Sequence, residues 1–256
     1  MRSHIYRSEA IILRRSDYGE ADRILTIYTP RFGKRRAIAK GVRKTTSRLA
    51  GHIELFTRAN LQLAEGRNLD IVTQAEIIAP YRTLRQDLER ISFAYYVAEL
   101  LDKLTTDEEG QNSNYALLAE TLDALDTAPV PELAVRRFEL RLLGLVGYRP
   151  YLFHCSACQE TLTEEADRWT PAGGMLCPRC GPADPSAVPV SLPAFKALRF
   201  MQREPLDAVV GLRLRQEVLR EIEALLRITI RPILERDLKS VNFVNAVRSE
   251  GKETMP

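Results

Sequence analysis

The pattern of apolar and polar residues changes near Pro80. Before that position, residues 55–63 and 69–78 alternate between the two kinds at every second position, which is typical of half-buried strands. Residues 8–19 and 21–30 are rich in Ile, Leu, Thr and Tyr and are separated by turn residues. With the run after Gly33 they predict about five strands in about 75 residues, the size of a five-stranded OB-fold barrel.

After Pro80 the apolar residues recur every three or four positions, as on one face of a helix. The spacing, with Pro131, Ser191 and Pro205 as start and stop signals, predicts helices over roughly 84–101, 114–126, 131–147, 191–205 and 212–229. Residues 150–190 differ, because they are rich in Pro, Gly, Cys and polar residues. We therefore expect them to form an insertion without an apolar core of its own.

The cysteines of the chain all lie in that insertion, in the pattern C-x2-C-x18-C-x2-C. Cys155 with Cys158 and Cys177 with Cys180 can form two tight turns whose sulfurs approach one ion, and the spacing matches a zinc ribbon. Four thiolates close a tetrahedral site and leave no position for a catalytic water. The expectation is one structural Zn²⁺ per chain, with the neighbouring His154 as a bystander.

Three other uses of the cysteines are weighed against zinc. Two disulfides would need an oxidising compartment, which nothing in the sequence supports. A redox C-x-x-C should begin a helix in a βαβ unit, and neither pair does. Common iron–sulfur spacings differ from this one. Structural zinc remains the preferred interpretation.

These patterns predict an α+β protein of several domains. It has an N-terminal five-stranded OB-fold barrel and a C-terminal all-α domain with an inserted four-cysteine zinc ribbon. The expected ranges are 1–80 for a nucleic-acid-binding OB-fold domain, 81–149 and 191–247 for the two parts of the helical domain, 150–190 for the ribbon and 248–256 for a flexible tail.

The sequence favours neither an enzyme nor a membrane protein. Its histidines are His4, His52 and His154, and it contains no G-x-S-x-G, no H-E-x-x-H and no Gly-rich phosphate loop. Charges interrupt the first residues, so no secretory signal is expected, and no apolar run approaches the length of a membrane span. We expect a non-enzymatic cytoplasmic protein, associated with the nucleoid.

Positive charge is concentrated at the start of the chain. Residues 1–80 contain fifteen Lys and Arg against eight Asp and Glu, a net charge of +7, whereas the remainder contains 22 against 26, a net charge of −4. The stretch 31–48, RFGKRRAIAKGVRKTTSR, holds eight basic residues and no acidic one. Such an asymmetry indicates that the first domain meets a polyanion.

The basic stretch reads as a strand followed by a loop, and this arrangement can follow a phosphate backbone. Arg36 and Lys40 share a strand face, hydroxyls at 45–47 can bind phosphate oxygens, and Arg14 and Arg15 extend the patch from the first strand. Candidate rings for base stacking are Tyr18, Tyr28, Phe32 and Phe56, of which Tyr28 and Phe56 also suit the core. A solvated charged face, a membrane surface and an acidic protein partner remain alternatives.

Several segments of the sequence resemble the RecO family of bacterial recombination mediators. They are SEAIILRRSDYGEADRILTIYTPRFGK, AIAKGVRKTTSRLAGHIELFTRANLQL, FELRLLGLVGYRPYLFHCSAC, GGMLCPRC and ERDLKS, and they span nearly the whole chain. The run KGVRKTTSR is the most specific of the short elements. A basic segment of the family is matched by Lys34, Arg35, Arg36, Lys40, Arg43, Lys44 and Arg48, which are therefore expected to contact DNA.

The resemblance implies more than the residues do. It implies binding of single- and double-stranded DNA, annealing of strands, and loading of recombinase onto DNA coated with single-strand-binding protein. It also implies two partners, the RecR clamp and the acidic, hydrophobic C-terminal tail of single-strand-binding protein. Candidates for the tail pocket in the helical body are Arg136, Arg137, Phe138, Arg141 and Leu142. The alternative is a zinc-stabilised interaction scaffold that binds RNA or an acidic protein.

Overall fold

The computed structural model describes residues 4–105, 112–234 and 238–253. It divides into two compact units, Met1–Asp126 and Thr127–Pro256, each of which is described by itself. Within the described residues, none of the helices combines the length and the apolar character needed to cross a membrane.

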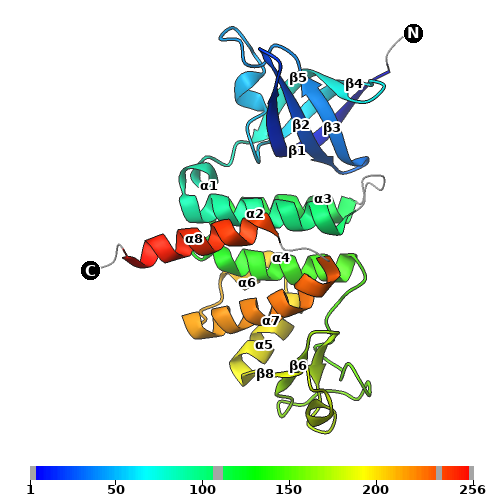
Figure 1. The fold of residues 1–256 in the computed structure, drawn as a ribbon, viewed down its shortest axis with the longest axis vertical. Helices are drawn as coiled ribbons and strands as arrows, with labels where there is room; N and C mark the ends of the chain where they lie inside the picture. The colour runs from blue at the N-terminus through cyan, green and yellow to red at the C-terminus, as the bar shows by residue number, and fades with distance from the viewer. Residues whose placement is uncertain (1–3, 106–111, 235–237, 254–256) are drawn as a thin grey trace. The chain divides into compact units, whose positions relative to one another are not determined.

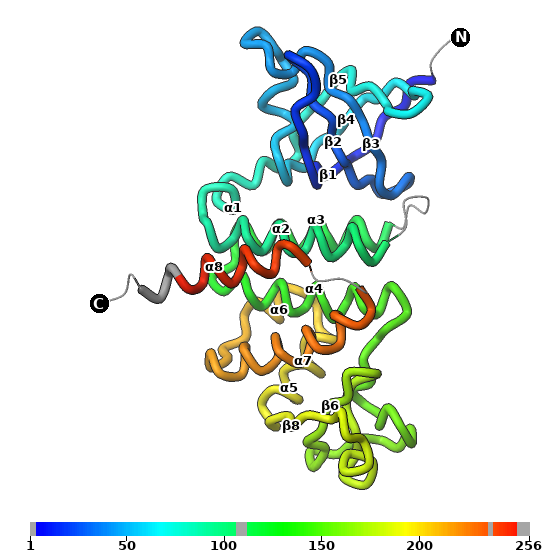
Figure 2. The backbone as a smooth tube through the Cα atoms, in the orientation of Figure 1, coloured from blue at the N-terminus to red at the C-terminus, as the bar shows by residue number. Residues whose placement is uncertain are grey.

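Five strands of the first unit form a closed barrel in the order β1-β2-β3-β5-β4 (Figures 1 and 2). All neighbouring pairs are antiparallel except β3 and β5, which are parallel. This confirms the five-stranded OB-fold barrel predicted from the sequence. The strands are β1 (Ile5–Tyr18), β2 (Asp22–Thr29), β3 (Gly33–Ala39), β4 (Arg58–Ala64) and β5 (Asp70–Ala79).

The length of β1 allows it to close the barrel, because its first half pairs with β4 and its second half with β2. A register shift between Ile12 and Arg14 bends the strand where it changes partner. The predicted alternation holds in β4, whose Leu61 and Leu63 face the core. The predicted alternation fails in β5. A register shift between Gln62 and Leu63 of β4 changes the pairing with β5, and Val72 lies in the core where the alternation predicted Ile71 and Thr73.

Three helices belong to the same compact unit as the barrel: α1 (Arg82–Gln86), α2 (Leu88–Leu104) and α3 (Asn112–Thr127). The single helix expected over 84–101 is divided at Asp87, whose side chain caps α2 by accepting a hydrogen bond of 2.9 Å from the N–H of Arg90. The barrel is tied to α3 through Glu9, which accepts 3.0 Å hydrogen bonds from Arg58 and from the Tyr115 hydroxyl. The compact unit thus continues past residue 80, where the sequence predicted a domain boundary.

The second unit contains the remaining helices and the cysteine-rich insertion. Pro131 begins α4, and the Ser191 hydroxyl caps α5 by accepting a 3.3 Å hydrogen bond from the N–H of Ala194, as their sequence signals predicted. Pro205 separates α5 from α6. The helices are α4 (Pro131–Leu145), α5 (Leu192–Arg203), α6 (Leu206–Val210), α7 (Gln216–Leu234) and α8 (Lys239–Glu253).

The tail expected from residue 248 is instead helical as far as Glu253, and residues 254–256 lie outside the described residues. Arg248 of α8 forms ion pairs of 2.8 Å with Glu132 of α4 and 2.6 Å with Glu223 of α7. Burial acts to raise the pKa of Glu223, but Arg136 and Arg248 outweigh it and hold this pKa below its usual value. The C-terminal segment is therefore bound into the second unit by charge.

The insertion folds as a small ribbon whose three strands are ordered β7-β6-β8. These are β6 (Arg168–Thr170), β7 (Gly174–Leu176) and β8 (Val188–Pro189). Trp169, the single tryptophan of the chain, is fully buried and donates a 3.0 Å hydrogen bond from Nε1 to Oγ1 of Thr229 on α7. This side chain fastens the ribbon to the helices of its own unit.

Gly174 should be essential to the ribbon, whereas its neighbour Gly173 should not. Gly174 has a φ of 109°, and a Cβ there would lie 2.6 Å from the backbone oxygen of Tyr151. Replacing Gly174 with Ala should reduce the free energy of unfolding by about 2 kcal/mol or more. Thermal unfolding followed by Trp169 fluorescence measures this change.

Gly173→Ala is the matched control for this substitution. A Cβ at position 173 would meet nothing closer than Ser156 Cβ, at 3.4 Å. The thermal unfolding midpoint of the Gly173→Ala variant should therefore shift by much less. Equal shifts for the two variants would contradict the assigned close approach.

Arg136 should contribute to stability through a buried ion pair. Its Nη1 lies 3.2 Å from Oε2 of Glu139, and both side chains are almost wholly buried. Arg136→Ala leaves the carboxylate of Glu139 without this partner in a buried position, so unfolding in urea should show a loss of about 3 kcal/mol. The exposed Arg141 on the same helix is the control, and Arg141→Ala should change stability by only about 0.5 kcal/mol.

Candidate metal centre and nucleic-acid surface

The four cysteine sulfurs converge on one point of the ribbon. Their Sγ atoms all lie within 4.8 Å of one another, and the Sγ atoms of Cys158 and Cys177 are 3.7 Å apart. A tetrahedral ion with metal–sulfur bonds of about 2.3 Å requires sulfur–sulfur distances of about 3.8 Å. The four side chains are free thiols rather than disulfides, so they fit a tetrathiolate metal site.

Backbone groups favour the thiolate forms that a metal requires. Burial acts to raise the pKa of Cys155, but hydrogen bonds from backbone N–H groups, including that of Cys177 at 3.4 Å, lower it to about 6. The pKa of Cys177 is also lowered, chiefly by the N–H of Cys180. Hydrogen bonds with Cys177 and Cys158 raise the pKa of the Cys180 thiol to about 12, so this thiol keeps a proton that a bound metal would displace. His154 is not among the clustered ligands.

Two of the predicted basic residues lie on the outer side at the end of β3, Arg36 within the strand and Lys40 just after it. Arg36 and Lys40 are exposed and alternate with Ala37 and Ala39, which are buried in the barrel core. The strand pairing sets Arg36 opposite Thr26 of β2, and Thr26 opposite Arg14 of β1. A cross-strand row of the barrel surface therefore carries two of the predicted DNA-contacting residues.

The basic loop that follows β3 is held against the turn between β1 and β2. The N–H of Gly41, which has a φ of 65°, donates to Oδ1 of Asp22 at 2.7 Å, and the N–H of Arg43 donates to the oxygen of Ala21 at 2.9 Å. Arg43 also donates from Nη1 to the oxygen of Gly19 at 3.3 Å. The loop is thus fixed at its beginning, with exposed Lys44 beyond this anchor.

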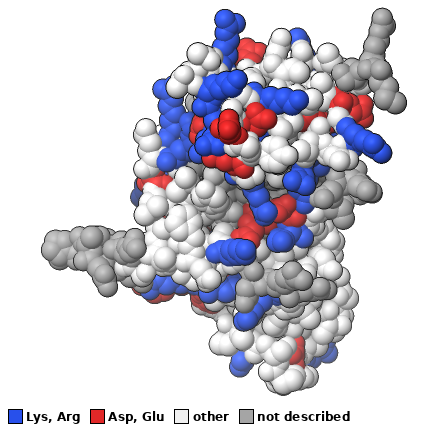
Figure 3. Space-filling view, turned by 45° about the horizontal axis from the view of Figure 1, so that its top comes forward, with Lys and Arg blue, Asp and Glu red and all other residues white. Residues whose placement is uncertain are grey.

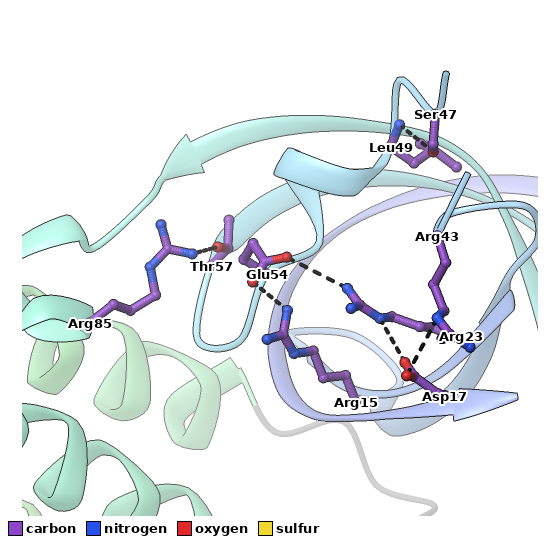
Figure 4. A network of polar contacts seen from close by, with 9 residues as sticks. All are labelled: Arg15, Asp17, Arg23, Arg43, Ser47, Leu49, Glu54, Thr57 and Arg85. Carbon is purple, nitrogen blue, oxygen red and sulfur yellow. Dashed lines mark hydrogen bonds and ion pairs between the residues drawn. The ribbon is translucent and has the colours of Figure 1, made fainter. Parts of the chain in front are cut away.

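Four of the nine predicted DNA-contacting residues are paired with carboxylates of the protein. Arg14 and Lys34 reach the two oxygens of Asp102 on α2, at 2.5 and 2.8 Å. Figure 4 shows the other two: Arg15 pairs with Glu54 and Arg43 with Asp17. Arg23, which the sequence analysis did not select, lies between them and contacts both Asp17 at 3.0 Å and Glu54 at 3.6 Å.

The other five have no carboxylate within ion-pair distance among the residues that the structure describes, and all are exposed. Lys and Arg side chains are spread over the barrel surface, with acidic side chains among them (Figure 3). The unpaired cations belong to β3 and the loop after it: Arg35, Arg36, Lys40, Lys44 and Arg48.

Only some of the candidate rings are open to a ligand. Tyr28 and Phe56 are fully buried and belong to the core, whereas Tyr18 is 55% exposed. Phe32 is partly buried, with the guanidinium groups of Arg31 and Arg35 at 5.6 and 5.7 Å from its ring centre. Tyr18 pairs with Asp22, whose carboxylate anchors the basic loop, so the most exposed of the candidate rings lies beside that loop.

The residues expected to line a partner pocket do not form an open site. Phe138 and Leu142 are fully buried, and Arg136 and Arg137 are 3% and 5% exposed. Arg137 donates to the backbone oxygen of Glu204 at 3.2 Å. Arg141 alone of the five is exposed. Four of the five residues are therefore covered in this structure, because α4 is buried along most of its length, and a tail pocket in the helical body stays a prediction.

Comparisons with known proteins agree over the whole chain. A family model described as Recombination protein O N terminal matches residues 1–81, and one described as Recombination protein O C terminal matches residues 85–242. A protein of Roseiflexus sp. (strain RS-1), named DNA repair protein RecO, is 49% identical over 257 residues, which cover 100% of this chain and 90% of the relative. Proteins of the same name from Dehalococcoides mccartyi (strain ATCC BAA-2100) and Pelotomaculum thermopropionicum are 35% and 38% identical and cover 96% and 94% of this chain and 97% and 94% of their own length. The chain belongs to the RecO family.

Proposed function

We propose that this protein is a non-enzymatic mediator of DNA repair and recombination, which binds single- and double-stranded DNA through the outer face of the barrel. It anneals complementary strands and helps to load recombinase onto DNA coated with single-strand-binding protein. The observation that supports this best is the group of five exposed, unpaired cations on β3 and its following loop. The names of the relatives agree with such a role.

The barrel surface suits phosphates better than base edges. Lys and Arg on a strand and loop can follow a charged backbone, and the exposed Tyr18 offers one ring to an unpaired base. The side chains of Arg43 and Asp17 are 36% and 55% exposed, so this pair is weak and can open when a phosphate arrives. Recognition of this kind depends on charge and is largely blind to sequence.

Annealing needs no chemical step under this proposal. Two complementary strands repel each other through their phosphates, and a basic surface that binds them lowers this repulsion. The RecR clamp and the acidic, hydrophobic tail of single-strand-binding protein are proposed partners, on the strength of the family. The protein would act in the cytoplasm, at the nucleoid.

We also propose that the tetrathiolate site holds one structural Zn²⁺. The sulfur–sulfur distance fits a tetrahedral ion, and four thiolates suit zinc with no open position. When bound, zinc would supply cross-linking of the two turns rather than catalysis. Cys155, Cys158, Cys177 and Cys180 would hold it.

Removing charge from the basic loop should weaken DNA binding and flatten its dependence on salt. If about four phosphates are neutralised on a single strand, log K falls with log salt at a slope of about −3. The triple change Arg43→Ala, Lys44→Ala and Arg48→Ala should reduce that slope to about −1. Fluorescence anisotropy of a labelled oligonucleotide, titrated at several salt concentrations, measures both affinity and slope.

The matched control removes three cations that are paired with carboxylates in the second unit: Arg179, Lys196 and Arg227. This control variant should keep the salt dependence of DNA binding shown by the unaltered protein. Equal losses of DNA affinity in both triple variants would argue against a DNA site on the barrel. The same variants in an annealing assay with precoated strands, with and without the tail of the coating protein, test the mediator role. A preference for RNA or an acidic protein over single-stranded DNA would support the scaffold alternative.

Metal analysis should find one zinc ion per chain, held by the cysteines alone. Cys177→Ser should lose most of the metal and lower the unfolding midpoint, because the ribbon depends on the ion for much of its stability. His154→Ala should keep both metal content and midpoint. Protein that is purified without chelators and contains no zinc would contradict the proposal.

A further inference from the structure

A cavity of about 910 Å³ lies within the second unit, between the ribbon and its supporting helices. Residues 147–154 and 171–173 line it from the ribbon side, and Gln202 of α5 and Thr229 of α7 line it from the helical side. It contains none of the DNA-contacting or metal-binding residues predicted from the sequence. Its volume is within the range of ordinary ligand sites.

Aromatic rings stand open to solvent on the wall of this cavity. Tyr148 and Tyr151 are 55% and 47% exposed, and Phe153 is partly buried. Exposed tyrosines grouped at one concave site are a feature of surfaces that bind a partner.

The backbone holds both tyrosines firmly. The N–H of Tyr148 donates to the oxygen of Leu143 at 2.8 Å, just after Gly147 with its φ of 88°. Tyr151 exchanges two hydrogen bonds of 2.8 Å with the ribbon hairpin, donating to Gly173 and accepting from Met175. Rings on fixed backbone lose little freedom when a ligand binds.

Arg149 lines the cavity, and Arg199 and Arg203, which are not among its lining residues, lie beside one of its rings; none of the three has a carboxylate within ion-pair distance among the described residues. The guanidinium groups of Arg199 and Arg203 lie 4.5 and 5.2 Å from the ring centre of Phe153. Arg149 lines the cavity and donates a long, 3.5 Å hydrogen bond to Oε1 of Gln202. No Asp or Glu is among the described residues that line the cavity. The site is therefore positive and aromatic at once.

We propose that this cavity is a second binding site for single-stranded nucleic acid, in which unpaired bases stack on Tyr148 and Tyr151 and phosphates contact Arg149, Arg199 and Arg203. Rings with free faces beside unpaired guanidinium groups are the combination by which proteins hold single strands without reading sequence. An acidic peptide would use the arginines, but it would gain less from two separate, open ring faces. The proposal shares with the proposed function only the class of ligand, because no residue is common to the two sites.

The first experiment measures the second site alone, in the triple alanine variant of Arg43, Lys44 and Arg48. A short oligo-dT should still bind this zinc-loaded variant, and adding Tyr148→Ala with Tyr151→Ala should weaken binding about tenfold or more. The conservative changes Tyr148→Phe and Tyr151→Phe retain the rings and should retain affinity. Fluorescence of Trp169, whose indole bonds to the lining residue Thr229, should change on binding.

The second experiment locates the strand on the unaltered protein. Oligonucleotides carrying 5-iodouracil should cross-link under light to Tyr148 or Tyr151, as mapped by mass spectrometry. Cross-links confined to the barrel, with equal affinity in the alanine and phenylalanine variants, would overturn the cavity site and leave the barrel function intact. Displacement of Trp169-reported binding by an acidic, apolar peptide, without any cross-link to the tyrosines, would assign the cavity to a protein tail instead.

Discussion

The protein's own carboxylates pair with four of the basic residues on the barrel, Arg14, Arg15, Lys34 and Arg43, so only part of the barrel's positive charge remains unpaired. The side chains of Lys34 and Asp102 are only 15% and 13% exposed. Opening that pair would leave a largely buried carboxylate without its partner, which is costly in free energy. The more exposed pair of Arg43 with Asp17 is worth about 1 kcal/mol at most. Lys34 is therefore structural, fixing β3 to α2, whereas Arg43 can join the unpaired cations when a phosphate is present. Under the proposed function, the DNA-binding surface is the part of the basic stretch whose side chains are not paired with carboxylates of the protein.

The ribbon is too small to be stabilised by the burial of apolar side chains alone. Its strands contain three, three and two residues, and one buried tryptophan, Trp169, joins it to α7 by a hydrogen bond. Elements of that size need a cross-link, and four converging thiolates can provide it through a metal. The same smallness leaves space between ribbon and helices, and the cavity with its tyrosines occupies that space. A ribbon held together by clustered cysteines can therefore leave a concave surface where a larger domain would have a continuous hydrophobic core.

Local signals in the sequence predicted what local physics determines. Alternation predicted the barrel strands, Pro131 and Ser191 predicted helix starts, and the cysteine spacing predicted the sulfur cluster. Contacts between residues distant in the sequence could not be predicted. Nothing in the basic stretch shows that Asp102 will neutralise Lys34. Nor does the alternation in the sequence show that a register shift will exchange the buried and exposed faces of β5. Arg136 and Phe138 look like a basic, apolar surface in sequence, but α4 is covered on several sides, which only the packing reveals. The tyrosines of the cavity carry no periodic signal, because loops place them there.

Both proposed strand sites share a property that suits pairing. Guanidinium and ammonium groups hold phosphates, and rings hold the flat faces of bases, so neither kind of contact occupies the Watson–Crick edges. A protein that read those edges would have to release them before a complementary strand could pair. A surface of exposed cations and tyrosines instead holds a strand extended with its edges free, and two such sites allow one chain to bind two strands. Binding must also be weak enough for the duplex to leave, which salt-screened surface charges provide and buried ion pairs do not. If the protein anneals strands as proposed, the exposure of Arg36, Lys40, Lys44 and Arg48 makes that binding reversible.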